Sequence, residues 1–316
     1  MANEVYGRGS AFGHGTESTY GTNVSRTNWL QLYNCTLQER PERDVIDHLS
    51  NGEVDFADEY DVRVACNGDL SMPFLFQGFG RVLQTAMGAA PTGSGPFTYN
   101  RGTGFTSKSL SVELIRGTSG QSEVFNGVVF PSWSLIFERN AVARFDAQIL
   151  GQKANAARAS AATASYGGTV QNRCAIGHHV GALTFNGTAH TCQRIEIAVN
   201  NNLSTLDELG SLYTSEPGQE RYGEVTINAT IVQRAETLYT ELRSGASSNI
   251  TFTITRGASA ALAVTARNCV LQSAPNEIRG SGLVLLECSW RAKATIGGDG
   301  ALTLVMTTGQ TNFSDN

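Results

Sequence analysis

The sequence predicts a mainly β protein made of two tandem β-sandwich or β-barrel domains, each flanked by a short α-helix. The first observation is an echo: LSVELIRG at residues 110–117 and ITFTITRG at 250–257 share one apolar-polar alternation and one Arg-Gly ending. The second is composition, because 34 glycines among many Thr, Ser and Asn residues indicate β structure with abundant turns. The third is length, since 316 residues are most simply two domains of about 150 residues.

A short amphipathic helix is predicted before each copy of the echo. In the first half, apolar residues at helical spacing run over 79–87 and stop at Gly88. In the second half, the same stripe runs over 235–242 and stops at Gly245. Glycine is common just after a helix because it accepts a left-handed backbone. Both halves therefore have the same predicted helix end.

Alternating strands surround these helices in the same order in both halves. Before the helices, residues 62–66 match 225–231, and the strand around Leu30 and Leu32 matches 195–199. After the echo, two further strand candidates close each half: 124–138 with 142–150, and 262–272 with 283–290. The order strand, loop, strand, helix, strand, strand, strand is thus expected twice.

The matched elements place the domain boundaries. We predict an N-terminal arm over residues 1–27, a first domain over 28–154, a linker over 155–191 and a second domain over 192–316. Residues 89–109 have no counterpart in the second half. Their sequence is rich in turn formers and lacks strand or helix periodicity, so we expect a surface loop there.

Two long acidic connections lie at matching places, over residues 39–61 and 203–223. Connections of this length in compact domains are usually functional or disordered, and the first contains apolar residues that it could bury. We therefore expect the connections to dock on another subunit. The acidic residues that we take as candidate contacts are Glu39, Asp44, Asp47, Glu53, Asp55, Asp58, Asp207, Glu208 and Glu216.

No catalytic arrangement is found, and we predict neither an enzyme nor a cofactor. The sequence contains no GxSxG, HExxH or P-loop pattern. The histidines fall outside the repeated strands and helices, where solvated side chains are expected. These are His14, His48, His178, His179 and His190.

Six cysteines lack CxxC spacing, so buried free thiols are expected. A cluster between the halves could in principle supply zinc ligands, but its spacing matches no familiar zinc motif. We predict no metal site and leave the role of the cluster open. It consists of Cys174, His178, His179, His190 and Cys192.

Charge and hydropathy limit the possible partners. Charged residues make up only 16% of the chain, which suggests a surface that partners bury. The chain has no apolar run of about 18 residues and no hydrophobic signal core, so we expect no membrane association and use in a cytosol. A net charge of −5 and the lack of a basic patch argue against tight nucleic-acid binding.

The N-terminal stretch 7–22, GRGSAFGHGTESTYGT, resembles the opening of phage tail tube proteins, also called major tail proteins. Many of these begin with a small-residue arm of the form GxxSxxxxGxExTYGT. The resemblance continues through residues 29–37, the first acidic connection and the helix near Gly78 to the strands that open at 125–127 and 266–268. Each motif is a loose pattern of small and apolar residues, and together they cover most of the chain.

The resemblance implies a structural protein of the virion of a long-tailed bacteriophage, assembled in the host cytoplasm. In that family the subunit is a β-sandwich flanked by a helix, and six units form a ring whose inner face is a continuous β-barrel. Rings stack into a tube through which DNA leaves the capsid. The long connection after the first strand contacts the adjacent ring, which makes the acidic candidates inter-ring contacts.

Further expectations follow from the same resemblance. The arm, with Ser10, Glu17 and Tyr20, would contact a neighbouring subunit. Because the domain is duplicated, three chains would supply the six units of a trimeric ring with pseudo-sixfold symmetry. The partners would be the chain itself, other tail proteins and DNA that passes through a neutral-to-acidic lumen without specific binding. An acidic lumen lets DNA slide, whereas Lys and Arg contacts to phosphate would arrest it.

Two alternatives remain open. One is a hexameric ring in which one domain of each chain lines the lumen and the other decorates the exterior, which the mass of a ring would distinguish. The other is a carbohydrate-binding adhesive β-sandwich protein, which predicts an exposed aromatic platform. Trp29, Trp133 and Trp290 lie in strand patterns, where core positions are expected instead.

Overall fold

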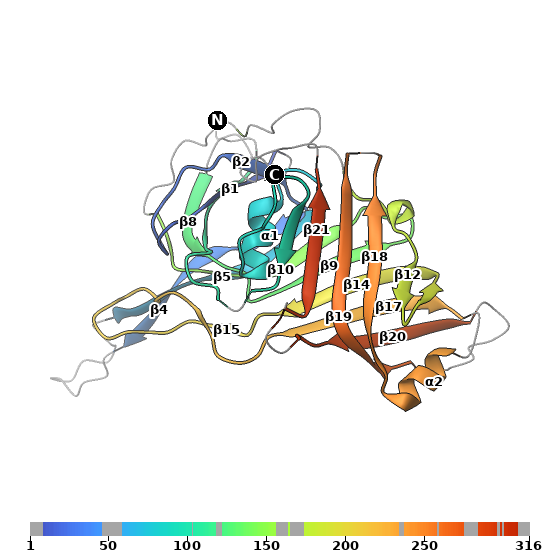
Figure 1. Ribbon diagram of the computed structural model, residues 1–316. Helices are drawn as coiled ribbons and strands as arrows, with labels where there is room; N and C mark the ends of the chain where they lie inside the picture. The colour runs from blue at the N-terminus through green and yellow to red at the C-terminus, as the bar shows by residue number, and fades with distance from the viewer. Residues whose placement is uncertain are drawn as a thin grey trace.

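A computed structural model describes most of the chain and shows a mainly β protein (Figure 1). The described residues are 9–45, 59–102, 104–117, 122–155, 164, 174–233, 237–257, 259–274, 284–295, 298 and 300–308. The elements of the first half are β1 (Ala11–Thr16), β2 (Asn28–Gln31), β3 (Asn34–Cys35), β4 (Gln38–Val45), β5 (Glu59–Pro73), α1 (Gly80–Met87), β6 (Phe97–Asn100), β7 (Leu110–Ile115), β8 (Ser122–Val128), β9 (Ser132–Glu138), β10 (Arg144–Gly151) and β11 (Lys153–Ala154).

The second half repeats much of this order. Its elements are the short 3-10 helix η1 (Gly177–His179), β12 (Leu183–Phe185), β13 (Thr188–His190), β14 (Cys192–Asn200), β15 (Leu203–Ser204), β16 (Gly218–Gln219), β17 (Glu224–Val232), α2 (Thr237–Ser244), β18 (Ser247–Thr255), β19 (Ala261–Ser273), β20 (Leu285–Ala292) and β21 (Leu302–Thr307). The predicted mainly β fold with one short helix in each half is confirmed.

Both predicted helix ends are confirmed. Gly88 follows α1 with a φ of 68°, and its N–H donates to the carbonyl of Gln84. Gly245 follows α2 with a φ of 62°, and its N–H donates to the carbonyl of Glu241. Both glycines lie in the left-handed region, where a side chain would strain the backbone.

The echo marks two equivalent hairpins. The strand LSVELI is β7 and pairs with β8, while ITFTIT lies in β18 and pairs with β19. Each Arg-Gly pair begins the turn, and Gly117 and Gly257 have positive φ angles of 72° and 71°. Arg116 and Arg256 therefore occupy matching turns.

Strand pairing repeats around these hairpins. The order β2-β1-β7-β8-β11 in the first half matches β13-β12-β18-β19-β21 in the second. The strands β9-β10-β5-β3 likewise match the C-terminal part of β19 followed by β20-β17-β14. The predicted match between residues 195–199 and the strand around Leu30 is wrong. In the first half, β3 and β4 pair with β5 in the same way that β14 pairs with β17 in the second half. The counterpart of β14 is therefore β3 together with β4.

One large sheet runs through both halves, because β9 of the first half pairs with β14 of the second over the full length of β9. A five-stranded sheet of the first half lies on the other side of α1 (Figure 1). β1 falls within the expected arm, and β12 and β13 fall within the expected linker. The division into two tandem domains at the predicted boundaries stays a prediction.

The expectation of a surface loop over residues 89–109 is wrong in part. Residues 97–100 form β6, which pairs with β21 of the second half in the register Tyr99 to Leu304. Phe97, Tyr99 and Phe105 are buried. The inserted segment therefore ties the two halves together, because Phe97 and Tyr99 enter the core that both halves share.

The core lies between the sheets and contains most large apolar side chains. Trp29, Trp133 and Trp290 are 4%, 3% and 0% exposed, which confirms their predicted core positions. The expectation of a solvated His14 is wrong, since β1 runs between β2 and β7 and carries this imidazole into the interior. His190 of β13 is also buried.

Candidate functional site

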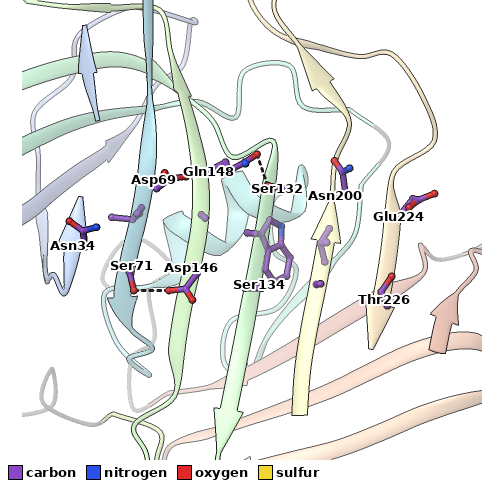
Figure 2. Close-up of a pocket in the computed structure, with 15 residues that line it drawn as sticks. Asn34, Asp69, Ser71, Ser132, Ser134, Asp146, Gln148, Asn200, Glu224 and Thr226 are labelled. Atoms are coloured by element: carbon purple, nitrogen blue, oxygen red, sulfur yellow. Dashed lines mark hydrogen bonds between the residues drawn. The ribbon is translucent and has the colours of Figure 1, made fainter. Parts of the chain in front are cut away.

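The large sheet presents a polar face that crosses both halves of the chain. Along β5, β10, β9, β14 and β17, alternate residues point into the core, and the residues between them point outward. The outward residues line a hollow of about 460 Å³ (Figure 2). Its labelled polar residues are Asn34, Asp69, Ser71, Ser132, Ser134, Asp146, Gln148, Asn200, Glu224 and Thr226.

Hydrogen bonds between strands order this face. The Ser71 hydroxyl of β5 donates to Asp146 Oδ1 of β10 at 2.6 Å. The Ser132 hydroxyl of β9 donates to Gln148 Oε1 of β10 at 2.9 Å (Figure 2). These bonds link polar side chains of neighbouring strands along the face.

Carboxylates outnumber guanidinium groups on the same face. From residue 67 of β5 across β10, β9, β14, β17 and β20, the outward carboxylates are Asp69, Asp146, Glu138, Glu196, Glu224 and Glu287, and the outward cations are Arg144, Arg194 and Arg291. Each of these arginines pairs with a carboxylate of the face. The positive charge is therefore neutralised locally, and an acidic excess remains.

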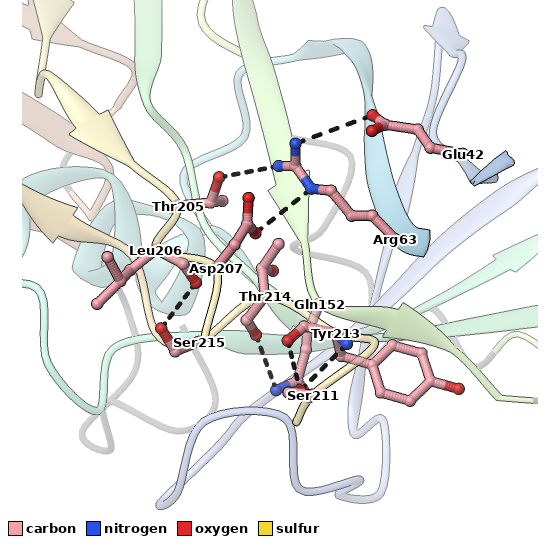
Figure 3. Close-up of polar contacts among 10 residues, drawn as sticks. All are labelled: Glu42, Arg63, Gln152, Thr205, Leu206, Asp207, Ser211, Tyr213, Thr214 and Ser215. Carbon is pink, nitrogen blue, oxygen red and sulfur yellow. Dashed lines mark hydrogen bonds and ion pairs between the residues drawn. The ribbon is translucent and has the colours of Figure 1, made fainter. Parts of the chain in front are cut away.

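A second candidate site is a projection in which the segment 203–223 packs against the hairpin of β4 and β5. The Val64 N–H of β5 donates to the Leu212 carbonyl at 3.0 Å. Arg63 lies at the centre: its Nε is 3.4 Å from Asp207 Oδ1, its Nη1 is 3.8 Å from Glu42 Oε1, and its Nη2 donates to Thr205 Oγ1 at 3.2 Å (Figure 3). The two acidic connections thus touch within one chain through an arginine that the sequence analysis did not single out.

Apolar side chains are exposed on this projection. Val62 of β5 is 55% exposed, and Leu206 and Tyr222 of the segment 203–223 are 61% and 98% exposed. Tyr60 and Leu209 are exposed as well. A surface of this composition is typical of a protein contact site.

The predicted acidic contacts are distributed over this projection and beyond it. Glu39 of β4 accepts a hydrogen bond from the Ala154 N–H at 2.9 Å, and Glu216 accepts one from the Ser107 N–H at 2.6 Å. Asp44 is exposed near the end of β4, and Glu208 is exposed in the segment 203–223. Asp47, Glu53, Asp55 and Asp58 lie outside the described residues.

The arm residues Ser10, Glu17 and Tyr20 make contacts within their own chain. The Glu17 carboxylate is 1% exposed and accepts hydrogen bonds from the hydroxyls of Ser109 and Ser111, both at 2.7 Å. It also accepts from the N–H groups of Gly21 and Gly127, both at 2.9 Å. Burial raises the pKa of Tyr20, and Ser10 Oγ accepts from the Gly117 N–H. An additional contact of the arm with a neighbour stays a prediction.

The cysteine and histidine cluster is spread over several elements. The backbone of Cys174 forms an isolated β-bridge with that of Leu75. His178 and His179 lie in η1, His190 lies in β13 and Cys192 lies in β14. Within the described part of the chain, no group of three or more His, Cys, Asp or Glu residues could hold a metal ion.

All six thiols are free, and burial raises their pKa. The pKa rises to about 12 for Cys66, Cys192, Cys269 and Cys288. The expected buried position is confirmed for Cys66, Cys269 and Cys288, while the other three are half-buried.

The polar face was missed by sequence reasoning, although its signal is present. In β17 the residues Thr226, Asn228 and Thr230 alternate with buried aliphatic residues. Such alternation shows that one face is polar, but it does not show that five strands from two halves align their polar faces. That alignment depends on the long-range pairing of β9 with β14.

Comparison with known proteins places the chain in one family. The family model described as phage tail tube protein matches residues 7–311, nearly the whole chain. A search of curated proteins found no match. No helix among the described residues has the length and apolarity needed to span a membrane.

Proposed function

The chain belongs to the phage tail tube protein family, and we propose that it polymerises as stacked rings into the tail tube through which phage DNA is ejected. Membership makes it a structural, self-assembling component of a bacteriophage virion. The lumen, the ring symmetry and the route of assembly in the host cytoplasm are the parts that we propose.

One observation carries the proposal: a polar sheet face runs without interruption from β5 of the first half to β17 of the second. A tube lumen needs such a face, because its wall is in contact with water and DNA along its whole length. The opposite side of the same strands is apolar and buried, as the wall of a tube also requires.

The charge of the face favours passage of DNA over binding. Each Lys or Arg that neutralises a phosphate releases counterions and strengthens attachment, and the effect would add up over many rings. Here every outward arginine of the face is paired with a carboxylate, whereas Asp69 forms no ion pair within the part of the chain that the structure describes. A mildly acidic lumen would repel the phosphate backbone and keep it sliding.

We propose that three chains form one ring. The repeated strand order gives each chain two similar units that share the polar face, so three chains supply six units with pseudo-sixfold symmetry. The alternative hexamer has one luminal and one decorating unit per chain. The continuity of the polar face across both units favours the trimer.

We assign the projection to contacts between stacked rings. It holds the predicted acidic contacts Glu39, Asp44, Asp207, Glu208 and Glu216, together with the exposed apolar residues described above. Apolar surface next to a carboxylate-rich rim is suited to a protein partner, and stacked rings place a second copy there. The arm would reach a neighbouring subunit.

The other classes are less well supported. The family is structural, which favours a virion component over an enzyme. The adhesive alternative requires an exposed aromatic platform, yet all three tryptophans are buried. Neither alternative explains why one polar face crosses both halves.

Negative-stain electron microscopy of the purified full-length protein tests the proposal. Tubes with a regular axial repeat are expected, and native mass measurement of a single ring should give three chains. Persistent monodisperse monomers over a range of concentration and salt would contradict tube formation. A ring of six chains would contradict the trimer.

A further inference from the structure

We propose that the ring closes when residues 33–38 of one chain, the first edge, pair antiparallel with residues 271–274 of the next chain, the second edge. The register would copy the pairing of β14 with β9 inside each chain. This inference rests on the proposed ring and names the surface through which its subunits meet.

The internal junction provides the template. β14 runs antiparallel to β9, with Val199 opposite Trp133, Ala198 opposite Ser134 and Ile197 opposite Leu135. The buried residues of the two strands face the core, and the small polar residues face the hollow. One unit of the chain therefore meets the other through a continuous strand pair.

The first edge corresponds to β14. Leu70 of β5 pairs with Cys35, as Ile227 of β17 pairs with Ile197. Two residues further along, Leu37 takes the place of Val199, and both side chains are buried, at 0% and 2% exposure. Thr36 then takes the place of Ala198, on the polar face.

The second edge corresponds to β9. Leu271 of β19 pairs with Trp290, as Trp133 of β9 pairs with Ala147. Trp290 and Ala147 are themselves equivalent, because they pair with Ile227 and Leu70 on their other sides. The register of β19 against β20 shifts between Leu271 and Ser273, so Gln272 is the extra residue of a β-bulge. Ser273 pairs with Ser289, the equivalent of Asp146, and therefore takes the place of Ser134. The buried Ala274 then takes the place of Leu135.

Both edges have an open side among the described strands. β3 and β4 pair with β5 alone. On β19, the pairing with β18 ends at Val270, so Leu271–Ser273 have a described partner strand only in β20. Arg116 donates to the Leu37 carbonyl at 2.9 Å and holds the first edge in place.

A second copy of the chain is the partner that fits these edges. The unpaired backbone groups of an open strand edge are satisfied by another strand. Inside the chain, the strands equivalent to the two edges, β14 and β9, already pair with each other. The two edges differ from each other, so the contact is head-to-tail and closes into a ring when the rotation permits. If each junction turns by the same angle, three chains close a ring of six units.

Cysteine pairs test the register in assembled tubes of the full chain. Directly opposed residues of an antiparallel pair have Cα atoms about 4.5–5.5 Å apart, within the range for a disulfide. Thr36→Cys with Ser273→Cys should form a bond between chains, because both positions are exposed on the polar face. The matched control, Ser134→Cys with Ala198→Cys, should form its bond within one chain.

After mild oxidation, the first variant should give covalent dimers and trimers on a non-reducing gel, with three chains as the largest product. The control should migrate as a monomer, and Thr36→Cys with Thr253→Cys, an exposed position of β18, should show only the background of oxidised unaltered protein. Ala274→Cys alone, which would use the native Cys35, provides a second route if the double variant fails to assemble.

The possible results separate this inference from the proposed function. If tubes form and the control bond closes, but neither variant yields products between chains above background, the proposed edges are wrong. A largest product of six chains also overturns the inference. If the unaltered protein forms no tubes, the ring itself fails, and the inference fails with it.

Discussion

Arg194 of β14 and Glu138 of β9 lie directly opposite each other, and their Nε and Oε1 atoms are 3.1 Å apart. This ion pair links the two halves of the chain on the polar face. Both side chains are almost half exposed, at 43% and 49%, so water screens their attraction. The stability of the junction must therefore come mainly from the buried side of the same strands.

Two substitutions in β9 separate these contributions. Glu138→Gln should lower the free energy of unfolding by less than about 1 kcal/mol, because it removes an exposed ion pair. Leu135→Ala should lower it by about 2–5 kcal/mol, because Leu135 is 0% exposed and opposes the buried Ile197. Urea denaturation of the unassembled protein measures both. Equal effects would show that the ion pair contributes as much to the junction as the buried packing does.

The helix ends offer a matched pair of glycine substitutions. At Gly245 an added Cβ meets no atom within 4 Å. Gly245→Ala should therefore lower the free energy of unfolding only by the penalty of placing alanine in a left-handed backbone conformation, about 1–2 kcal/mol. At Gly88 the Cβ would lie 2.7 Å from the Phe105 ring, so Gly88→Ala should cost a further 1–3 kcal/mol, roughly. Thermal unfolding of the two variants gives the comparison. Equal losses of stability would mean that the Phe105 ring moves aside at little cost.

Much of this architecture could be predicted from local sequence. The helix ends at Gly88 and Gly245 and the two equivalent Arg-Gly pairs could be predicted, because each depends only on residues close together in the chain. The pairing of Tyr99 with Leu304 and of Trp133 with Val199 joins residues far apart in sequence. No local pattern specifies such partners. The polar face therefore could not be predicted, although the alternation within each strand could.

Buried polar residues were also beyond local reasoning. Glu17 stood out as part of a family motif, but the motif did not show that its carboxylate gathers four donors inside the chain. Those donors come from three separate segments, the turn at Gly21, the start of β7 and the end of β8. A buried anion is tolerated there because its oxygens are fully hydrogen-bonded.

Glu17→Gln tests this anchor. The amide keeps the size of the side chain but turns an NH₂ group toward donors, so the variant should lose roughly 2–3 kcal/mol of unfolding free energy. Glu39→Gln is the matched control, since Glu39 is only half-buried and accepts one hydrogen bond, from Ala154. It should lose less than about 1 kcal/mol. Similar values for the two variants in chemical denaturation would argue against Glu17 as an anchor.

His14 should make stability depend on pH. Burial, together with the nearby Arg81 charge, lowers the pKa of His14 from 6.5 to about 3. Below pH 6.5 the unfolded chain takes up a proton that the folded chain refuses, so this contribution to stability is complete above pH 6.5 and is lost as the pH falls toward 3. At pH 5 the loss should be about 2 kcal/mol.

Denaturation midpoints at pH 7.5 and pH 5 measure the effect of His14. His14→Gln retains a donor for the Gly78 carbonyl, which His14 Nε2 contacts at 3.0 Å, but it cannot titrate. The variant should lose less stability than the unaltered protein between the two pH values, while the titration of carboxylates contributes to both. An identical loss in the two proteins would show that His14 does not contribute.

The acidic excess of the polar face should govern how fast DNA passes. Asp69→Lys with Glu224→Lys places two cations in each chain on the wall of the proposed lumen, at positions that line the hollow. Both positions are exposed, so assembly should be preserved. DNA ejection from virions that carry the variant should slow, because each ring would then attract the phosphate backbone.

Glu241→Lys in α2 is the matched control, since it changes charge outside this face and should leave ejection unchanged. The slowing should also weaken as the ionic strength rises, because salt screens exposed charges. A purely structural defect would show no such salt dependence. Intact tubes with unaltered ejection kinetics at low salt would mean that lumen charge does not control DNA passage, even if the tube assignment is correct.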